Sequence, residues 1–91
     1  MEVSAPYPNP VRTGTQVQVD LFSACPKSVH GVVMSVAYRK LAYFMVRVSG
    51  QSKTGWDLRD LKGREVASGV YYLVLQTDGE NRIVRKILVL R

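Results

Sequence analysis

The chain has 91 residues, of which 46% are hydrophobic and 22% charged, and its formal net charge is +6. This length allows one domain with a modest core, and the composition excludes a disordered segment. No stretch approaches the roughly 18 apolar residues of a membrane helix. The single cysteine, Cys25, excludes an internal disulfide and a cysteine-based zinc site. We therefore expect no membrane insertion, no metal and no cofactor.

Prolines and apolar alternation predict the elements of the first half of the chain. Three prolines between residues 6 and 10 lack amide donors, which indicates extended edge or linker backbone. Residues 15–22 alternate polar and apolar side chains, a pattern typical of a half-buried strand with its odd-numbered residues inside. We then expect a loop over 23–27, a strand over 32–38 whose even-numbered residues share one face, and a turn at Arg39–Lys40.

The second half continues as strands separated by turn signals. We expect a strand over 41–48, a polar segment over 49–55, a short strand end at Trp56–Leu58, a strand over 70–77 and a last strand over 82–90. The break at Ser68–Gly69 and the hairpin signal at Asp78–Gly79 separate the final elements. No stretch combines a helical period with caps. Six or seven short strands predict an all-β fold, an antiparallel β-sandwich.

The sequence contains no recognisable catalytic or ligand-binding motif. The lone His30 completes neither a metal site nor a catalytic triad. Gly63 and Gly69 lie six residues apart, but Gly69 leads into a strand rather than into the helix N-terminus of a phosphate loop. We interpret Asp57 and Asp60 as turn residues, with a weak calcium site as the alternative.

The aromatic residues are predicted to serve mainly the core. Trp56 is the only tryptophan, and in a small sandwich such a side chain usually fills the interior. Tyr71 is expected inside, and Tyr72 on the outer face, where it could join a partner surface. The alternative is a sugar-stacking platform built from Trp56, Tyr72 or Tyr43.

The thirteen lysines and arginines are scattered along the chain rather than clustered. Neighbouring residues on a strand point to opposite faces, so the short basic pairs need not form a patch. The sequence also lacks a recognition helix and an aromatic stacking motif. We therefore interpret the charge as a solvated basic surface and expect no specific binding to nucleic acid.

Three blocks of the sequence resemble a known family. They are Tyr7, Pro8, Asn9 and Pro10 near the start, Trp56 and Asp57 followed by Gly63, Arg64 and residues 66–71 in the middle, and residues 86–90 at the end. In this order they resemble two related domain types. One is the immunoglobulin-like domain of flagellar hook-capping proteins, and the other is the C-terminal sorting domain of type IX secretion cargo.

The resemblance implies a fold, a location and recognition residues. It implies an immunoglobulin-like β-sandwich of about seven strands over residues 1–91, at the end of a larger secreted or cell-surface protein. Gly69 and Tyr71 match the family's Gly-x-Tyr motif, Lys86 matches the basic residue of its last strand, and Arg91 stands near its terminal basic position. The export machinery is thought to read the final hairpin of such sorting domains.

The chain departs from the family pattern in two places. Residues 36–41 replace a turn that usually contains Gly-Arg, so this turn is expected to be shaped differently. The segment before Trp56 is short, so we expect an altered or missing edge strand.

Residues 1–4 lack the basic and apolar regions of a signal peptide. We interpret the chain as a module of a longer protein.

We therefore predict a non-catalytic C-terminal module of an exported bacterial protein. It would act as a secretion sorting signal, a surface anchor or a spacer, with the export machinery or neighbouring domains of the parent chain as partners. Two alternatives remain: a structural assembly domain of the hook-capping type, and a carbohydrate-binding module.

Overall fold

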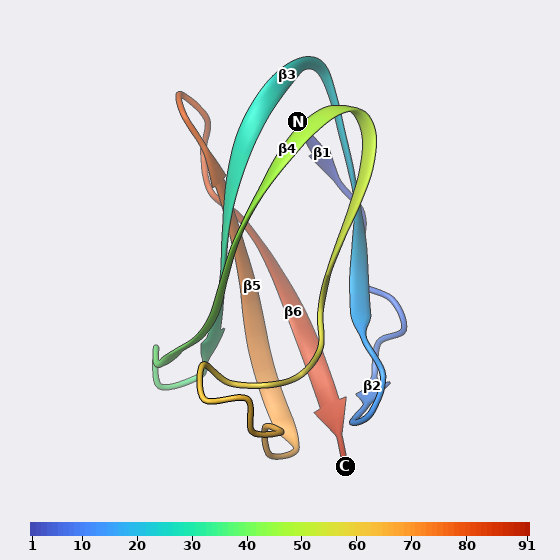
Figure 1. Cartoon of the computed structure of the whole chain (residues 1–91), viewed down its shortest axis with the longest axis vertical. Coiled ribbons are helices and arrows are strands. Elements are labelled where there is room, and N and C mark those ends of the chain that lie inside the picture. The colour runs from blue at the N-terminus through green and yellow to red at the C-terminus, as the bar shows by residue number, and fades with distance from the viewer.

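The computed structural model describes all 91 residues and contains six strands and no helix. The strands are β1 (Glu2–Val3), β2 (Val11–Arg12), β3 (Val17–Ser35), β4 (Lys40–Trp56), β5 (Gly69–Thr77) and β6 (Ile83–Leu90) (Figure 1). The all-β prediction is confirmed, and the arrangement is compatible with a β-sandwich. The count is six strands rather than about seven. No element is a helix of the length and hydropathy needed to cross a membrane.

Two long, bent strands explain the lower count. β3 has 19 residues and β4 has 17, and they pair antiparallel from Val17 opposite Trp56 to Met34 opposite Lys40. The predicted loop over 23–27 and the predicted polar segment over 49–55 both lie inside these strands, so neither interrupts them. A register shift between Ser23 and Lys27 accommodates the extra residues, and both ribbons arch over at the top of Figure 1.

The bend divides the β3–β4 hairpin between the two sides of the molecule. The first half of β3 pairs with β1 and with the second half of β4. The second half of β3 pairs with the first half of β4 and with β5, and the sheet continues through β6 to β2. β2 runs parallel to β6, so the sheet is not purely antiparallel. The edge strand expected to be altered or missing before Trp56 is present as the end of β4.

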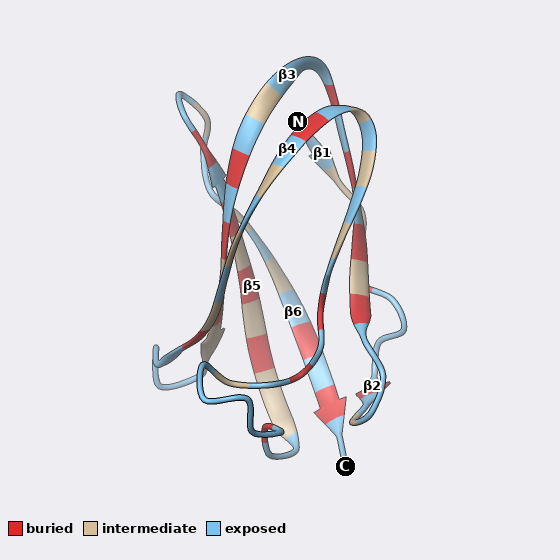
Figure 2. Cartoon of the chain, viewed as in Figure 1, coloured by how far each residue is buried: buried red, intermediate tan, exposed pale blue.

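Sixteen buried residues form one core between the two sides. The predicted inward positions Val17, Val19 and Leu21 are all at most 3% exposed, and Tyr71 and Leu73 are buried on β5. Figure 2 shows the resulting alternation of buried and less buried residues along β5. Period-two alternation therefore identified the inner faces of these strands correctly.

The predicted strand over 32–38 needs a correction at its end. β3 stops at Ser35, and Val36 and Tyr38 lie in the turn, where the Tyr38 side chain is 82% exposed. Tyr38 has φ of 63°, in the left-handed region that the tight turn requires. The backbone amide of Tyr38 donates to the carbonyl of Ser35 at 3.0 Å. Turn geometry therefore overrides the apolar alternation at these two residues.

Candidate functional site

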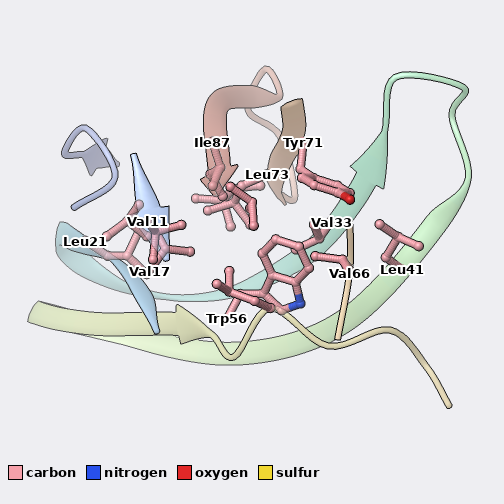
Figure 3. Close-up of a cluster of buried hydrophobic side chains, with 14 of the residues drawn as sticks. Val11, Val17, Leu21, Val33, Leu41, Trp56, Val66, Tyr71, Leu73 and Ile87 are labelled. Carbon is pink, nitrogen blue, oxygen red and sulfur yellow. The ribbon is translucent and has the colours of Figure 1, made fainter. Parts of the chain in front are cut away.

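The conspicuous middle block of the sequence forms a loop that is tied to the core through Trp56 and Tyr71. Trp56 is 5% exposed, and its ring meets the Tyr71 ring edge-on, with centroids 5.5 Å apart and an interplanar angle of 62° (Figure 3). The Trp56 indole Nε1 donates to the carbonyl of Arg59 at 3.0 Å, and the Tyr71 hydroxyl donates to the carbonyl of Ala67 at 2.6 Å. Burial raises the pKa of Tyr71. Both aromatic residues thus bury their rings and hold the loop backbone with their polar atoms.

The two aspartates of the loop stabilise turns, as predicted. Asp57 Oδ1 accepts from the amide of Arg59 at 3.2 Å. Asp60 Oδ1 accepts from the amides of Lys62 at 2.9 Å and Arg64 at 3.0 Å. The hydrogen bond from the Arg64 amide is the main reason that the pKa of Asp60 lies below its ordinary value. No group of three or more His, Cys, Asp or Glu residues is placed to hold a metal ion.

The two glycines of the middle block, Gly63 and Gly69, both have a positive φ. Gly63 has φ of 78°, in the left-handed region, and its amide donates to the carbonyl of Asp60 at 3.0 Å. This turn position therefore favours glycine for its backbone. Gly69 has φ of 157°, a positive value that side chains rarely adopt, although a Cβ added there would meet no atom within 4 Å. The backbone at the start of β5 therefore also favours glycine, although space for a side chain is available.

The proline-rich start of the chain covers the outer edge of the last strand. The carboxamide of Asn9 donates from Nδ2 to the carbonyl of Lys86 at 3.0 Å and accepts at Oδ1 from the amide of Leu88 at 2.9 Å. The flanking Pro8 and Pro10 have no amide donors that would need partners there. Asn9 therefore replaces a neighbouring strand for one residue pair, and β2 then pairs with the end of β6. The motif around Asn9 does not by itself indicate this role.

We expect Asn9→Ala to expose this edge of β6. The change leaves the Leu88 amide and the Lys86 carbonyl without a protein partner, and a net loss of about 1 kcal/mol is typical of one such hydrogen bond. Amide hydrogen exchange should become faster at Leu88, while Asn81→Ala, in the exposed β5–β6 turn, should leave it unchanged. Unchanged protection of Leu88 in the Asn9 variant would contradict this role.

The predicted recognition residues lie in two places. Tyr72 and Lys86 are cross-strand partners on β5 and β6, so their side chains share the outer face. Tyr72 is half-buried and Lys86 is exposed. Arg91 lies beyond the end of β6, where its backbone amide donates to the Ser68 hydroxyl at 2.9 Å. The structure therefore brings Tyr72 and Lys86 together and places Arg91 beside the start of β5.

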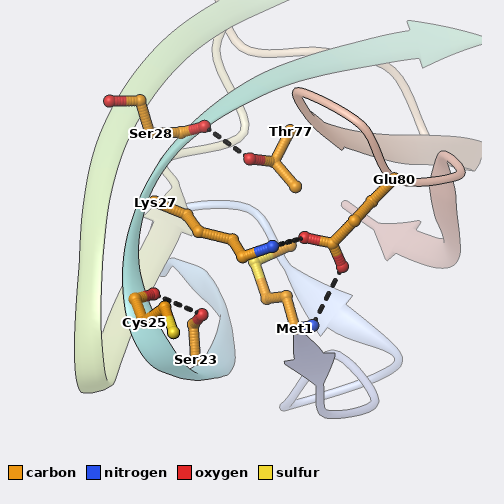
Figure 4. A network of polar contacts seen from close by, with 7 residues as sticks. All are labelled: Met1, Ser23, Cys25, Lys27, Ser28, Thr77 and Glu80. Carbon is orange, nitrogen blue, oxygen red and sulfur yellow. Dashed lines mark hydrogen bonds and ion pairs between the residues drawn. The ribbon is translucent and has the colours of Figure 1, made fainter.

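A polar network joins the β5–β6 turn to the bend of β3. Both lie at the end of the molecule away from the C-terminus (Figure 1). The carboxylate of Glu80 accepts from the Lys27 ammonium and, at 3.0 Å, from the amino group of Met1 (Figure 4). The Thr77 hydroxyl donates to the carbonyl of Ser28 at 2.9 Å. The hydrogen bond from Lys27 is the main cause that lowers the pKa of Glu80 below its ordinary value of 4.5. The sequence did not predict this network, because its members are far apart in the chain.

The Glu80 network predicts a stability change at acidic pH. A carboxyl group with a lowered folded-state pKa stabilises the fold above its unfolded-state pKa, and this stabilisation disappears as the pH falls through the folded-state value. We therefore expect Glu80→Gln to lower the urea midpoint at pH 7, and the difference from the parent chain to shrink below about pH 4. Glu2→Gln makes the same chemical change at an exposed residue outside the network and serves as the control. A constant Glu80→Gln difference down to acidic pH would contradict the prediction.

The aromatic positions bear on the sugar-platform alternative. Trp56 is in the core, so it cannot stack on a sugar in the folded protein. Tyr43 is 56% exposed and Tyr72 is half-buried. A hollow lies elsewhere, between β1, the first half of β3 and the second half of β4, and Asp20 and Phe22 are among the residues that line it. No tryptophan or tyrosine lines this hollow.

No protein-family model matches the sequence, and no curated protein matches it. Among solved structures, the chain is similar to part of PorZ, described as an essential bacterial surface component of the type-IX secretion system of Porphyromonas gingivalis. The TM-score is 0.68 at 23% identity, and the match covers 94% of this chain and 11% of PorZ. It is also similar to part of dimeric latent PorU from the same bacterium, with a TM-score of 0.74 at 18% identity, over 93% of this chain and 9% of PorU.

A β-glucosidase from Listeria innocua, solved with glucose, has a TM-score of 0.56 at 14% identity, over 97% of this chain and 15% of the enzyme. The chain thus spans between about a tenth and a seventh of each of these proteins. At these identities the likeness shows the fold alone. In its β-fold, the chain is similar to one small part of several much longer bacterial proteins.

Proposed function

We propose that this chain is a non-catalytic β-sandwich module of a longer secreted or cell-surface bacterial protein. In that role it acts as a sorting signal for type IX secretion, as a surface anchor or as a spacer. Its partners are the export machinery or the neighbouring domains of the parent protein. The terminal hairpin, β5–β6, is the part that the machinery would read in the sorting role, with Lys86, Arg91 and Tyr72 as its recognition residues.

The observation that carries the proposal is the structural use of the motif residues. The polar side-chain atoms of three motif residues form hydrogen bonds of 2.6–3.0 Å with backbone groups of the same chain. These residues are Trp56, Tyr71 and Asn9. These hydrogen bonds hold strands and the loop in place, so the three residues have a structural use. The similarity in fold to one part of PorZ supports an accessory role in a secretion-related protein.

A reporter assay tests the sorting role. The 91-residue chain would be fused to the C-terminus of a secreted reporter in a bacterium that has type IX secretion, and export would be measured by fractionation. We expect export with the intact chain and loss of export after removal of residues 78–91. Export that persists without these residues would exclude the sorting role and leave the anchor or spacer roles, which surface retention of the reporter distinguishes.

Point variants separate recognition from folding in the same assay. Lys86 and Arg91 are exposed, so the double variant Lys86→Glu/Arg91→Glu should fold like the parent chain. We expect this variant to reduce export. Arg82→Glu is the matched control, because Arg82 is exposed in the same hairpin at its turn. Equal export of the double variant and the control would remove the two basic residues from the proposed recognition surface.

A further inference from the structure

Two edges of the sheet, the outer edge of β6 and the outer edge of β4, differ in how far they are covered. The edge of β6 is covered by Asn9 and β2, and the Arg85 guanidinium reaches across to the carbonyls of Val3 and Ser4. β4 is hydrogen-bonded only to β3, so its other edge has no partner along its 17 residues. An uncovered strand edge presents unpaired amide and carbonyl groups to any extended chain that approaches it.

The first half of β4 has the composition of a strand that is normally covered. Residues 41–46 are six consecutive apolar residues, Leu-Ala-Tyr-Phe-Met-Val, with high β-propensity and no charge. Phe44 and Val46 are only half-buried against the core, while Tyr43 and Met45 are 56% and 68% exposed on the other face. Both faces of the strand therefore present apolar surface at the open edge.

Charges flank this apolar run on one face. Lys40, Tyr43, Met45 and Arg47 pair with Met34, Val32, His30 and Ser28 of β3, alternate residues that all point away from the core. A register shift beside Leu41 places Lys40 on this face, where its ammonium lies 5.9 Å from the centre of the Tyr43 ring. Neither Lys40 nor Arg47 takes part in any of the four ion pairs of the structure. β4 contains no acidic residue.

We propose that the edge of β4 over residues 40–48 binds an extended acidic segment by strand addition. The partner strand carries an acidic residue, two apolar residues and a second acidic residue at alternate positions, facing Lys40, Tyr43, Met45 and Arg47. Backbone hydrogen bonds supply the pairing, and the side chains supply the selectivity. This inference goes beyond the proposed function and uses a different edge from the terminal hairpin, so either can fail without the other.

A second copy of the chain fits this edge less well. Two β4 strands paired antiparallel about the centre of the run would place Lys40 of one copy opposite Arg47 of the other. Like charges directly opposite on neighbouring strands are destabilising, and β4 has no acidic residue to relieve them. Charge complementarity therefore favours an acidic partner over self-association.

Peptide titrations of the folded 91-residue chain test the proposal. The probe is a nine-residue peptide with blocked ends, Thr-Glu-Thr-Val-Thr-Val-Thr-Glu-Thr, and the readout is the backbone amide NMR spectrum of the chain. We expect shifts along residues 40–48 and binding about tenfold tighter than for the same peptide with lysine in place of glutamate. The preference should weaken as salt is added. A version N-methylated on every amide, which has no backbone donor on either edge to pair with a strand, should not bind.

A charge reversal completes the test. The variant Lys40→Glu/Arg47→Glu should reverse the preference, so that it binds the lysine peptide more tightly. Lys62→Glu/Arg82→Glu makes the same change of net charge at exposed residues away from β4 and should keep the preference of the parent chain. The proposal is overturned by equal binding of the two peptides, by shifts confined to β6, by dimerisation through β4, or by no binding at about 1 mM peptide.

Discussion

Trp56→Ala is expected to leave the chain unfolded or nearly so at room temperature. The substitution removes a side chain that is 5% exposed and that touches the Tyr71 ring in an edge-on pair. It also frees the carbonyl of Arg59 from its indole donor. Truncation of a buried tryptophan typically costs about 3–5 kcal/mol, which approaches the whole stability of a small domain. Urea unfolding followed by circular dichroism measures the loss.

The control for this prediction is Tyr38→Ala. Tyr38 is 82% exposed in the β3–β4 turn, so the same aromatic-to-alanine change should shift the urea midpoint very little. Trp56→Phe should lie between the two, because it keeps a ring in the core but loses the indole donor. A Trp56→Ala variant with the stability of the parent chain would show that the ring does not hold the core together.

Leu58→Ala is expected to have the second largest effect on stability. Leu58 is fully buried although it belongs to the loop that follows β4, and its φ of 64° lies in the left-handed region. A bulky residue keeps this conformation only when its surroundings impose it. The Leu58 carbonyl accepts from the Val66 amide at 3.0 Å, which joins the two ends of the loop. Loss of the buried side chain should cost about 2–5 kcal/mol in urea unfolding.

Leu61→Ala is the matched control, because Leu61 lies in the same loop and is 62% exposed. It should change stability by less than about 0.5 kcal/mol. If Leu58→Ala and Leu61→Ala had equal effects, the loop would not be anchored to the core through Leu58.

The parts of the fold that follow from local pattern were predictable. Alternation identified the inner faces of the first half of β3 and of β5, and the Asp78–Gly79 signal placed the hairpin between β5 and β6. The burial of Trp56 and the turn role of Asp60 also followed from residue type. The strand faces, the hairpin turn and the Asp60 hydrogen bonds depend on residues close in the sequence, and for Trp56 the residue type alone was sufficient.

The bend of the β3–β4 hairpin was not predictable in the same way. Pro26 and the polar residues around it are typical of a loop, and the same is true of residues 49–55. Pairing between the two strands continues on both sides of the bend, with Ser23 opposite Gly50 and Lys27 opposite Val48. Long-range pairing thus outweighed local preference, and it merged strands that the sequence presents as separate.

The contacts of the candidate surfaces also depend on long-range placement. Asn9 meets Lys86 and Leu88 across more than 75 residues of sequence, and Lys27 meets Glu80 across 53. No local pattern reports such contacts. The bare edge of β4 is likewise a property of the sheet order, since the apolar run over residues 41–46 is equally compatible with a central strand.

The fluorescence of the single tryptophan tests most directly whether the motif residues hold the strands together. Trp56 should emit at shorter wavelength in the folded chain than in urea, and acrylamide should quench it several-fold less efficiently than in the unfolded chain. Sugars should leave its emission unchanged. Emission and quenching in the folded chain that equal those in urea would place Trp56 at the surface and contradict the account.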